Sequence, residues 1–440
     1  MSTPVFLILK SIINMVNIDE NVKCSGAVIK IASRCNINCT YCYMYNLGDE
    51  TFKLQPKIMN EETINALLNK IKLHCLVEDI KKFQFILHGG EPLLAGKDFF
   101  KNFIKKANNY LLPEITPTYH IQSNGILIDK EWCDLFKEYK VNVGISLDGV
   151  KSVNDQYRVD HKGRGTYDSV IKGIKIVQEN NLGLGMLTVI NIDANPVELY
   201  EHLKLLKIDN VDFLLPDYTH DNLPSGITET SYTRESTPYA DWLISIFEIW
   251  FTDKDKLDIR LFKYCVCLLL GGKISFDYLG TSNNNVLVIE TDGGIEPVDS
   301  LKICGDGFTK MNANVSTHEF SEALSAPLSK MYHLSKKKIH KQCTVCPLKE
   351  ICGGGFLPHR YSEKNGFNNP SVYCADLIKL FTHINNRVIK EFSEEQREEF
   401  GNSGSISIKD IKNEIRESLK NVKEPTYVEE LEFFKIEKAM

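Results

Sequence analysis

Three cysteines stand close together directly after the first strand that the hydrophobic pattern predicts, at residues 26–32. They are Cys35, Cys39 and Cys42, and they share one loop. Three thiolates at this spacing can hold three irons of a cubane [4Fe–4S] cluster and leave the fourth iron without a protein ligand. An open metal position can bind a cofactor or substrate directly, as it does in catalytic zinc sites. A three-ligand zinc site and buried, unligated cysteines are the alternatives that the spacing leaves open.

A second group of four cysteines lies toward the end of the chain and consists of Cys343, Cys346, Cys352 and Cys374. Four thiolates can complete a cubane cluster or a zinc ribbon, because zinc also accepts four cysteines. An odd total of thirteen cysteines in tight clusters argues against disulfides and for metal binding in a reducing compartment. Most of the other six are expected to be buried, although Cys304 could approach a substrate or a cluster.

The first group carries Tyr41 before its last cysteine and so reads Cys-x3-Cys-x-Tyr-Cys. This pattern resembles the motif of the radical S-adenosylmethionine (SAM) superfamily. The resemblance implies that the open iron binds SAM, and that one electron from the cluster cleaves SAM to methionine and a 5′-deoxyadenosyl radical. The stretch Gly89-Gly90-Glu91-Pro92 resembles the turn that holds the SAM ammonium group in that family. Glycines allow a backbone to approach a ligand closely.

Polar residues at the ends of predicted strands continue the resemblance in chain order. Residues 122–125 and 146–149 end consecutive strands, where barrel active sites are built. The resemblance implies that Ser123 contacts the ribose, with Ser146 and Asp148 nearby, and that Arg158 pairs with the cofactor carboxylate. Turn capping is the alternative for Asn124 and Asp148. The implied SAM site consists of Tyr41, Gly89, Gly90, Glu91, Ser123, Asn124, Ser146, Asp148 and Arg158.

The second cysteine group resembles the SPASM extension of radical enzymes that act on peptides. In that extension four such cysteines bind an auxiliary [4Fe–4S] cluster. The family pattern has further cysteines at two positions where this chain has Val298 and Phe356. A second auxiliary cluster is therefore expected to be absent. We expect two [4Fe–4S] clusters in total, one that binds SAM and one that accepts an electron.

Short apolar runs alternate with helix-period segments from residue 26 to residue 215. We expect strands at 26–32, 83–88, 119–122, 141–147, 184–191 and 211–215, separated by helices at 60–75, 97–110, 129–140, 166–181 and 195–207. This rhythm is typical of βα units with a parallel sheet. Six units are too few for a closed eight-fold barrel, so the expected fold is α/β, a partial (β/α)6 TIM barrel open to a large substrate.

A cysteine-rich SPASM-type domain is expected after this barrel. The expected boundaries are an N-terminal extension at 1–23, a radical SAM core at 24–235, the auxiliary domain at 236–400 and a charged helical tail at 401–440. A helix is expected at 238–251. In the tail, Ile406, Ile408, Ile411 and Ile415 are spaced to form one apolar stripe.

Residues 213–222 and 352–374 look most like maturases of ribosomally made peptides that join an aromatic ring carbon to an aliphatic side-chain carbon. This resemblance implies an intramolecular C–C crosslink of the cyclophane type in a precursor peptide. Formylglycine formation, as in anaerobic sulfatase-maturating enzymes, is the first alternative. Another SPASM-type modification such as a thioether, and a non-catalytic zinc or iron–sulfur scaffold, are further alternatives.

A crosslinking reaction needs a base, and three residues are candidates. Asp299 matches the acidic residue proposed for that role in sulfatase maturases, although it could instead cap the following segment. Asp217 and His220 follow the sixth strand and are expected to face the cavity. An electron donor such as flavodoxin or ferredoxin is an implied partner.

The precursor peptide is the other implied partner. Only 34 residues precede Cys35, too few for the winged-helix leader-binding module of about 80 residues that many peptide maturases carry. We therefore expect that the core or a separate protein recognises the leader. The basic run at 336–341 could meet an acidic leader, or it could be an ordinary solvated face.

Composition excludes several other classes of protein. The net charge of −6, from 52 basic and 58 acidic residues, gives no basic face for nucleic acid. The first sixteen residues lack the features of a signal peptide, and no apolar run reaches the 18 to 20 or so residues of a membrane span. We therefore expect a cytoplasmic protein with no nucleic-acid or membrane partner.

Overall fold

A computed structural model describes residues 22–393, 395 and 404–436. Residues 1–21 of the expected N-terminal extension and residues 401–403 and 437–440 of the expected tail lie outside the described residues. Among the described residues, no helix is long and apolar enough to cross a lipid bilayer.

The described residues contain one ten-stranded sheet in the order β10-β9-β8-β1-β2-β3-β4-β5-β6-β7. Strands β1 to β7 are parallel, β8 pairs in parallel with β1, and β9 and β10 are antiparallel. The bounds are β1 (Gly26–Ala32), β2 (Lys82–Gly89), β3 (Thr116–Ser123), β4 (Asn142–Ser146), β5 (Leu184–Val189), β6 (Asn210–Leu214), β7 (Asp258–Ile259), β8 (Val286–Ile289), β9 (Gly294–Glu296) and β10 (Ala313–Asn314).

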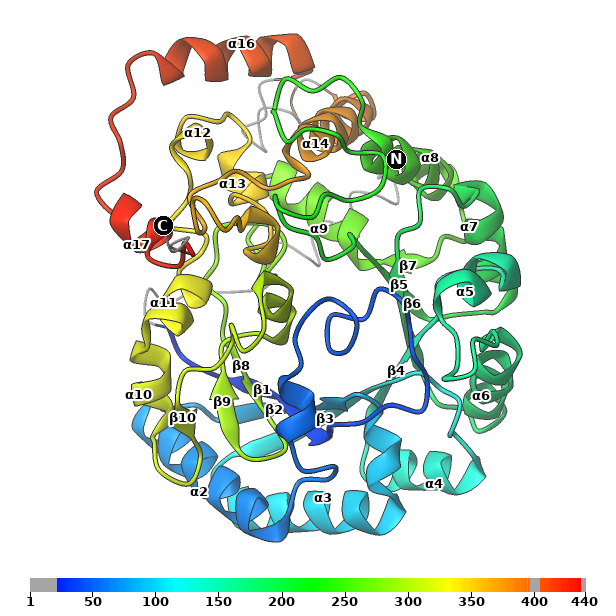
Figure 1. Ribbon diagram of the computed structural model, residues 1–440. Coiled ribbons are helices and arrows are strands. Elements are labelled where there is room, and N and C mark those ends of the chain that lie inside the picture. Colours follow the sequence, from blue (N-terminus) through cyan, green and yellow to red (C-terminus); the bar gives the residue numbers. More distant parts are fainter. Residues whose placement is uncertain (1–21, 394, 396–403, 437–440) are drawn as a thin grey trace.

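All six expected strands are present as neighbours in chain order, which confirms the partial barrel. Helices between them cover the outer face of the sheet (Figure 1). Three helices begin where the sequence supplies a capping side chain, because Asn60, Asp129 and Asn195 each accept a hydrogen bond from a first-turn backbone N–H. The bounds are α2 (Glu61–Val77), α3 (Lys97–Leu111), α4 (Lys130–Glu138), α5 (Lys151–Tyr157), α6 (Tyr167–Glu179) and α7 (Pro196–Leu205).

The sheet continues past the boundary that we expected at residue 235, because β7 extends one edge and β8 to β10 extend the other. The helices beyond this point are α8 (Pro238–Thr252), α9 (Arg260–Leu269), α10 (Phe320–Ser325), α11 (Pro327–His333), α12 (Lys341–Thr344), α13 (Lys349–Cys352), α14 (Cys374–Ile389), α16 (Ile408–Leu419) and α17 (Val428–Glu432). Four short 3-10 helices are η1 (Thr51–Leu54), η2 (Pro92–Ala95), η3 (Asp299–Cys304) and η4 (Pro358–Arg360) among the described residues.

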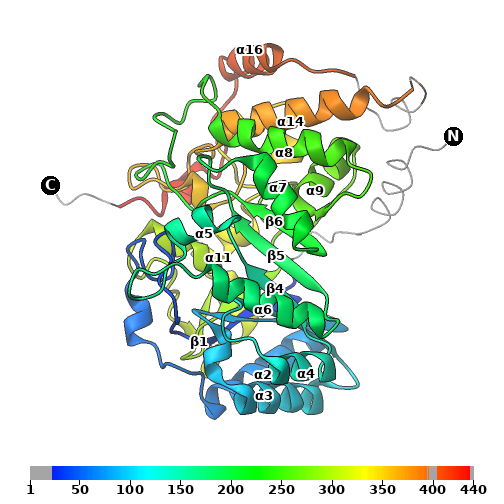
Figure 2. The same cartoon turned by 90° about the vertical axis from the view of Figure 1, so that its right-hand side faces the viewer.

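Helix α14 lies along α8, and α16 lies over α14 (Figure 2). A buried ion pair between Arg234 and Asp376 fixes the start of α14, and the same carboxylate accepts hydrogen bonds from the first turn of α8. In α16, Ile411 and Ile415 are buried, and Ile406 and Ile408 pack partly buried against the same core. The expected apolar stripe of the tail is confirmed.

Candidate active site

A cavity of about 220 Å³ opens where the parallel strands end. Its walls come from the loop after β1 and from the carboxyl ends of β2, β3, β4, β5 and β6. Strands of this kind deliver polar side chains to one end of a barrel, where active sites form. Most of the residues that the sequence assigned to SAM binding line this cavity, namely Tyr41, Gly89, Gly90, Ser123, Asn124, Ser146, Asp148 and Arg158.

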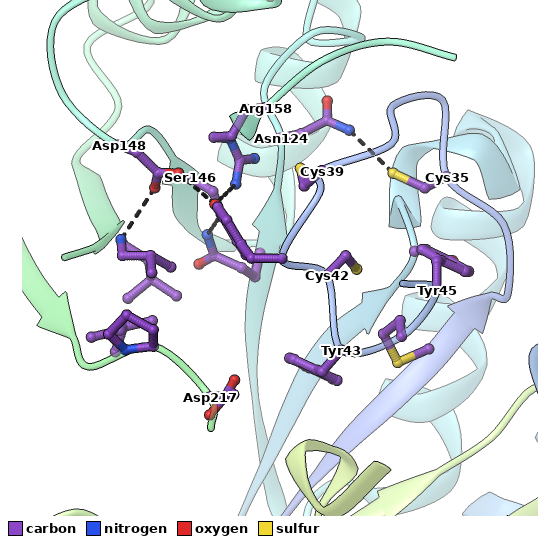
Figure 3. A pocket seen from close by; sticks show the side chains of 18 of the residues that line it. Cys35, Cys39, Cys42, Tyr43, Tyr45, Asn124, Ser146, Asp148, Arg158 and Asp217 are labelled. Carbon is purple, nitrogen blue, oxygen red and sulfur yellow. Dashed lines mark hydrogen bonds between the residues drawn. The ribbon is translucent and has the colours of Figure 1, made fainter. Parts of the chain in front are cut away.

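The three cysteines of the first group all line the same cavity (Figure 3). Burial raises the pKa of Cys35 and of Cys42 to about 12 and also raises the pKa of Cys39. Buried thiols of this kind become good ligands only when a bound cation stabilises the thiolates. Asn124 Nδ2 lies 3.7 Å from Cys35 Sγ and donates to it. The residues therefore fit an iron–sulfur cluster with one open iron that faces the cavity.

Two glycines bring the end of β2 against the cysteine loop. Gly90 N–H donates to Ala32 O at 2.9 Å, and a Cβ on Gly90 would stand 1.9 Å from the hydroxyl oxygen of Tyr45. Gly89 has a φ of +141°, and a Cβ there would stand 2.0 Å from Ala32 O. Only glycine fits such contacts, so this turn can present its backbone to the cavity.

Glu91 lies beneath the cavity and does not line it. Its carboxylate accepts hydrogen bonds from Ser123 Oγ at 2.9 Å, Asn124 N at 2.8 Å and Leu93 N at 3.0 Å. Burial raises the pKa of Glu91 to about 6. In this arrangement Glu91 holds the ends of β2 and β3 together, whereas the sequence had assigned its carboxylate to the SAM ammonium group.

A buried triad of polar side chains closes the cavity near the cysteines. Tyr41 donates its hydroxyl proton to Asp148, and Arg158 Nη1 donates to Tyr41 Oη at 2.9 Å (Figure 3). Burial raises the pKa of Asp148, and the nearby Arg158 charge partly offsets this effect. Ser146 Oγ accepts from Gln122 Nε2 at 2.8 Å. A cationic and an anionic side chain thus stand together at the wall of the cavity.

The structure separates the two residues expected at the end of β6. Asp217 lines the cavity, but His220 does not. His220 instead lies 2.8 Å from Pro370 O through Nε2, and its backbone N–H donates to Tyr361 O. His220 therefore joins two loops and takes no part in the cavity wall.

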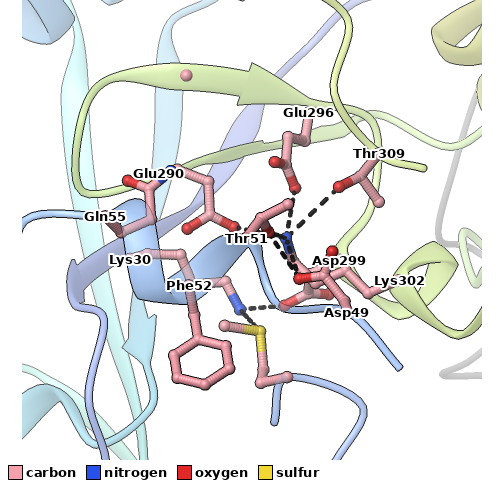
Figure 4. A network of polar contacts seen from close by, with 12 residues as sticks. Lys30, Asp49, Thr51, Phe52, Gln55, Glu290, Glu296, Asp299, Lys302 and Thr309 are labelled. Carbon is pink, nitrogen blue, oxygen red and sulfur yellow. Dashed lines mark hydrogen bonds and ion pairs between the residues drawn. The ribbon is translucent and has the colours of Figure 1, made fainter. Parts of the chain in front are cut away.

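Asp299 lies at the start of η3, behind the cavity wall. Lys30 Nζ donates to its Oδ2 (Figure 4). Tyr43 Oη donates to the same atom at 2.9 Å. Burial acts to raise the pKa of Asp299, but the Lys30 ammonium and His88 outweigh it and hold the pKa far below the usual range. Tyr43 lines the cavity and Asp299 does not, so Tyr43 stands between Asp299 and the cavity. The sequence analysis missed Lys30, although a lysine inside the apolar strand β1 was a signal.

A second buried lysine holds η3 in place. Lys302 Nζ lies 3.2 Å from Glu296 Oε2, 3.3 Å from Glu290 Oε1 and 3.6 Å from Asp49 Oδ2 (Figure 4). Burial and the neighbouring Glu296 raise the pKa of Glu290. Because Glu290 directly follows β8, Glu296 ends β9 and Asp49 follows the cysteine loop, this network ties the position of Asp299 to both segments.

The four cysteines of the second group line one small cavity together with Leu348, Leu377 and Phe381. Burial raises the pKa of Cys343 and of Cys346 to about 12. Gln342 Nε2 lies 3.3 Å from Cys374 Sγ. Within the described residues, no three His, Cys, Asp or Glu side chains lie close enough together to bind a single metal ion. The fit to a cluster rests on the shared, mostly apolar cavity and on the convergence of four thiols.

Apolar side chains, Val298 and Phe356, stand at the two positions where the family pattern has further cysteines. Phe356 stacks on Tyr278 with ring centroids 4.2 Å apart, and Val298 packs partly buried in the same cluster. Cys304 is buried in this cluster too, and burial raises its pKa well above the usual range. The sequence had left the role of Cys304 open, and in the structure Cys304 packs among apolar side chains.

The basic run at 336–341 meets acidic side chains of the chain itself. Lys338 pairs with Glu430 and Lys341 with Glu424, both in the tail. Lys336 is buried and donates to Gly355 O at 2.9 Å. Three of the four lysines that we considered for an acidic leader are therefore paired or buried within the fold, and Lys337 is exposed.

Comparisons with known proteins agree with this site. The sequence model of the Radical SAM superfamily matches residues 29–206. The cysteine-type anaerobic sulfatase-maturating enzyme of Clostridium novyi is 27% identical over 375 residues, which cover 82% of this chain and 95% of that protein.

Two solved structures share the fold. Native anSMEcpe with bound AdoMet has a TM-score of 0.70 at 24% identity and covers 83% of this chain and 98% of its own. Streptococcus suis SuiB bound to precursor peptide SuiA has a TM-score of 0.52 at 18% identity and covers 77% and 72%. Together with the cysteine loop and the cavity, the sequence matches show that residues 29–206 are a radical SAM domain and that the protein is a radical SAM enzyme.

Proposed function

We propose that this enzyme modifies a peptide and that its product is a C–C crosslink of the cyclophane type within a ribosomal precursor peptide. The observation that carries this proposal is the composition of one end of the cavity. Tyr43, Tyr218 and Tyr278 line it together with Leu214 and Leu215. Such a wall suits an aromatic side chain, because aromatic rings pack well against one another.

The chain's own residues divide the work of binding. Cys35, Cys39 and Cys42 hold the first cluster, and Cys343, Cys346, Cys352 and Cys374 hold the auxiliary cluster. When bound, SAM and the first cluster supply a 5′-deoxyadenosyl radical after one-electron reduction by a donor such as flavodoxin or ferredoxin.

Four cavity residues orient SAM. The backbone of Gly89 and Gly90 approaches its methionine moiety, and Arg158 and Asp148 offer opposite charges to its carboxylate and ammonium groups. The apolar side chains of Leu187 and Val189 line the cavity and keep water from the reacting carbon.

The packing around Val298 and Phe356 supports a total of two clusters. A peptide that forms one crosslink loses two hydrogens, one as a hydrogen atom and one as a proton together with an electron. One auxiliary cluster is enough to accept that electron. We therefore assign the tetrad to this task.

Formylglycine formation is the second candidate function. The 27% identity to a cysteine-type sulfatase-maturating enzyme over most of both chains favours it, and so does the presence of Asp299. The two functions predict different products. A C–C crosslink creates no aldehyde, whereas formylglycine is an aldehyde.

The test uses the anaerobically reconstituted protein with SAM, dithionite and a synthetic copy of the short peptide encoded beside its gene, hereafter the neighbour peptide. We expect a product two hydrogens lighter, with fragment ions missing between the joined residues and no reaction with a hydrazide probe. A hydrazide-reactive product would establish the second function instead. The variant with alanine at positions 35, 39 and 42 is the control, because it should form no 5′-deoxyadenosine and keep about four irons in the tetrad.

A further inference from the structure

Two carboxylates of the described residues line the cavity, Asp148 and Asp217, and they differ in how they are held. Glu91, Asp148 and Asp299 are each held by at least two hydrogen bonds or an ion pair. Within the described part of the chain, Asp217 Oδ1 is buried and has no hydrogen-bond partner. The side chain is 20% exposed and lines the cavity, so it can meet a bound peptide.

His359 stands behind this carboxylate. Its Nε2 lies 3.7 Å from Asp217 Oδ1, and its side chain is only 1% exposed. In the described residues this nitrogen has no hydrogen-bond partner. The ring is held between Phe356 and Tyr373, with centroid distances of 5.3 and 4.9 Å. Because the two aromatic rings hold the imidazole in place, it can interact with Asp217 but cannot reach into the cavity.

The loop that carries Asp217 is also tied to the auxiliary cysteines. Tyr373 precedes the ligand Cys374, and its hydroxyl donates to Pro216 O at 2.7 Å. Asp217 therefore follows directly after a residue that is hydrogen-bonded to the start of α14. A group that releases a proton at Asp217 lies beside the path by which its electron reaches the tetrad.

We propose that Asp217 accepts the proton that leaves the peptide after the new bond has formed, with His359 as its positioning residue. This inference rests on the proposed function and adds the acid–base step to it. The ring carbon that joins the new bond must lose its hydrogen as a proton and one electron. The proton passes to the Asp217 carboxylate, the electron passes to the oxidised auxiliary cluster, and the ring regains its aromatic electrons.

His359 then stabilises the protonated form of Asp217. The proton that Asp217 accepts can be shared with His359 Nε2, which has no other partner among the described residues. Closing the present 3.7 Å separation to a hydrogen bond requires a shift of less than 1 Å. The pair thus holds one proton away from the peptide while the product forms.

Asp299 is less suited to this step. Tyr43 separates it from the cavity, and Lys30 stabilises its charged form. A carboxylate held in an ion pair is a weak proton acceptor, because protonation would leave the buried lysine without a partner. The geometry therefore assigns the contact with the peptide to Asp217.

The test compares five full-length, cluster-loaded variants on the neighbour peptide in D2O buffer, with Asp299→Asn as the fifth. Asp217→Asn keeps the shape of the side chain but cannot accept a proton. We expect its crosslink yield to fall about 100-fold, the usual contribution of a general base, while 5′-deoxyadenosine still forms. Recovered peptide should carry one deuterium from solvent, because a radical that cannot lose its proton instead gains an electron from dithionite and a deuteron from the buffer. Asp217→Glu, which keeps a carboxylate, should retain the wild-type ratio of crosslink to nucleoside within about fivefold.

His359→Phe keeps the aromatic packing and removes Nε2, so its melting temperature should stay close to that of the wild type while its crosslink-to-nucleoside ratio falls about tenfold. Asp221→Asn is the matched control, since Asp221 lies on the same loop but accepts from Glu363 N outside the cavity. Its ratio should equal that of the wild type. Fluorescence anisotropy of a labelled neighbour peptide supplies a readout that does not depend on turnover, and dissociation constants should agree within about twofold across the set.

Three results would overturn the inference. They are an unchanged ratio in Asp217→Asn, a loss of peptide affinity that accounts for all of its lost product, and the same uncoupling in Asp299→Asn but not in Asp217→Asn. Failure of the proposed function is a separate outcome. It would appear in the identity of the wild-type product, whereas the inference depends on the ratios between variants and wild type.

Discussion

Replacing Lys30 with methionine should expose how strongly the fold depends on one buried charge pair. The ammonium of Lys30 is fully buried and pairs with Asp299, whose side chain is 11% exposed. Methionine fits the space beside Met44, which already contacts Lys30 Nζ at 3.3 Å. Removal of one partner leaves the Asp299 carboxylate buried without its counter-charge, at a cost of about 3–5 kcal/mol.

This cost can be converted into a change of melting temperature. An unfolding entropy of about 2.1 cal/mol/K per residue over 440 residues gives about 0.9 kcal/mol/K. The single variant should therefore melt about 3–5 °C below the wild type when unfolding is cooperative. Anaerobic scanning calorimetry of the cluster-loaded protein measures this difference directly.

The double variant Lys30→Met/Asp299→Asn provides the decisive comparison. The amide of asparagine is neutral and its oxygen can still accept the hydrogen bond from Tyr43, so more than half of the lost stability should return. If the single variant melts with the wild type, or the double variant melts no higher than the single one, the charge pair does not have the role that its burial indicates.

Three further changes test other parts of the molecule. Gly90→Ala should lower the yield of folded protein and abolish SAM binding, measured by equilibrium dialysis, because its Cβ would stand 1.9 Å from Tyr45 Oη and 2.5 Å from Arg34 O. Gly183→Ala is the control and should leave yield and SAM binding nearly unchanged, because its Cβ would meet nothing nearer than 3.6 Å. The raised pKa of Glu290 means that the folded state holds its proton more strongly than the unfolded state, so this group's contribution to stability is present below the ordinary glutamate range and is lost as pH rises through the folded pKa. The melting temperature of the wild type relative to Glu290→Gln should therefore fall between pH 5.5 and pH 8. A difference in melting temperature that stays constant over this range would contradict the raised pKa. Cys346→Ala should reduce iron to about four per chain and stop crosslinking while 5′-deoxyadenosine still forms, and an unchanged iron content would show that Cys346 is not a ligand.

The barrel could be predicted because its signals are local. Asn60, Asp129 and Asn195 mark helix starts by hydrogen bonds to residues two or three positions away. Apolar runs such as 26–32 and 184–191 identify strands without any knowledge of what packs on them. The cysteine loop is equally local, since its ligands come from eight consecutive residues.

The far end of the cavity could not be predicted in this way. His359 stands 142 positions after Asp217 in the sequence, and only the tertiary fold brings Nε2 of the one to 3.7 Å from Oδ1 of the other. His220 was a reasonable choice from spacing, but its loop turns the ring toward Pro370. Tyr43 gave no signal beyond its place next to Cys42, because its partner Asp299 belongs to η3.

The single sheet that joins the barrel to the cysteine-rich part has a consequence for how the substrate enters. Strands β8 to β10 continue the barrel from β1, and Tyr373, next to Cys374, donates its hydroxyl proton to Pro216 O, so the described residues join the cysteine-rich part to the barrel at two places. Such a framework fixes the spacing of its redox centres at the moment of folding, whether or not substrate is present. We therefore expect that the barrel and the cysteine-rich part do not move apart when the target binds. The cavity must hold SAM as well as the reacting side chain, so we expect the target to enter as a flexible segment, and compact folded domains are excluded by their shape.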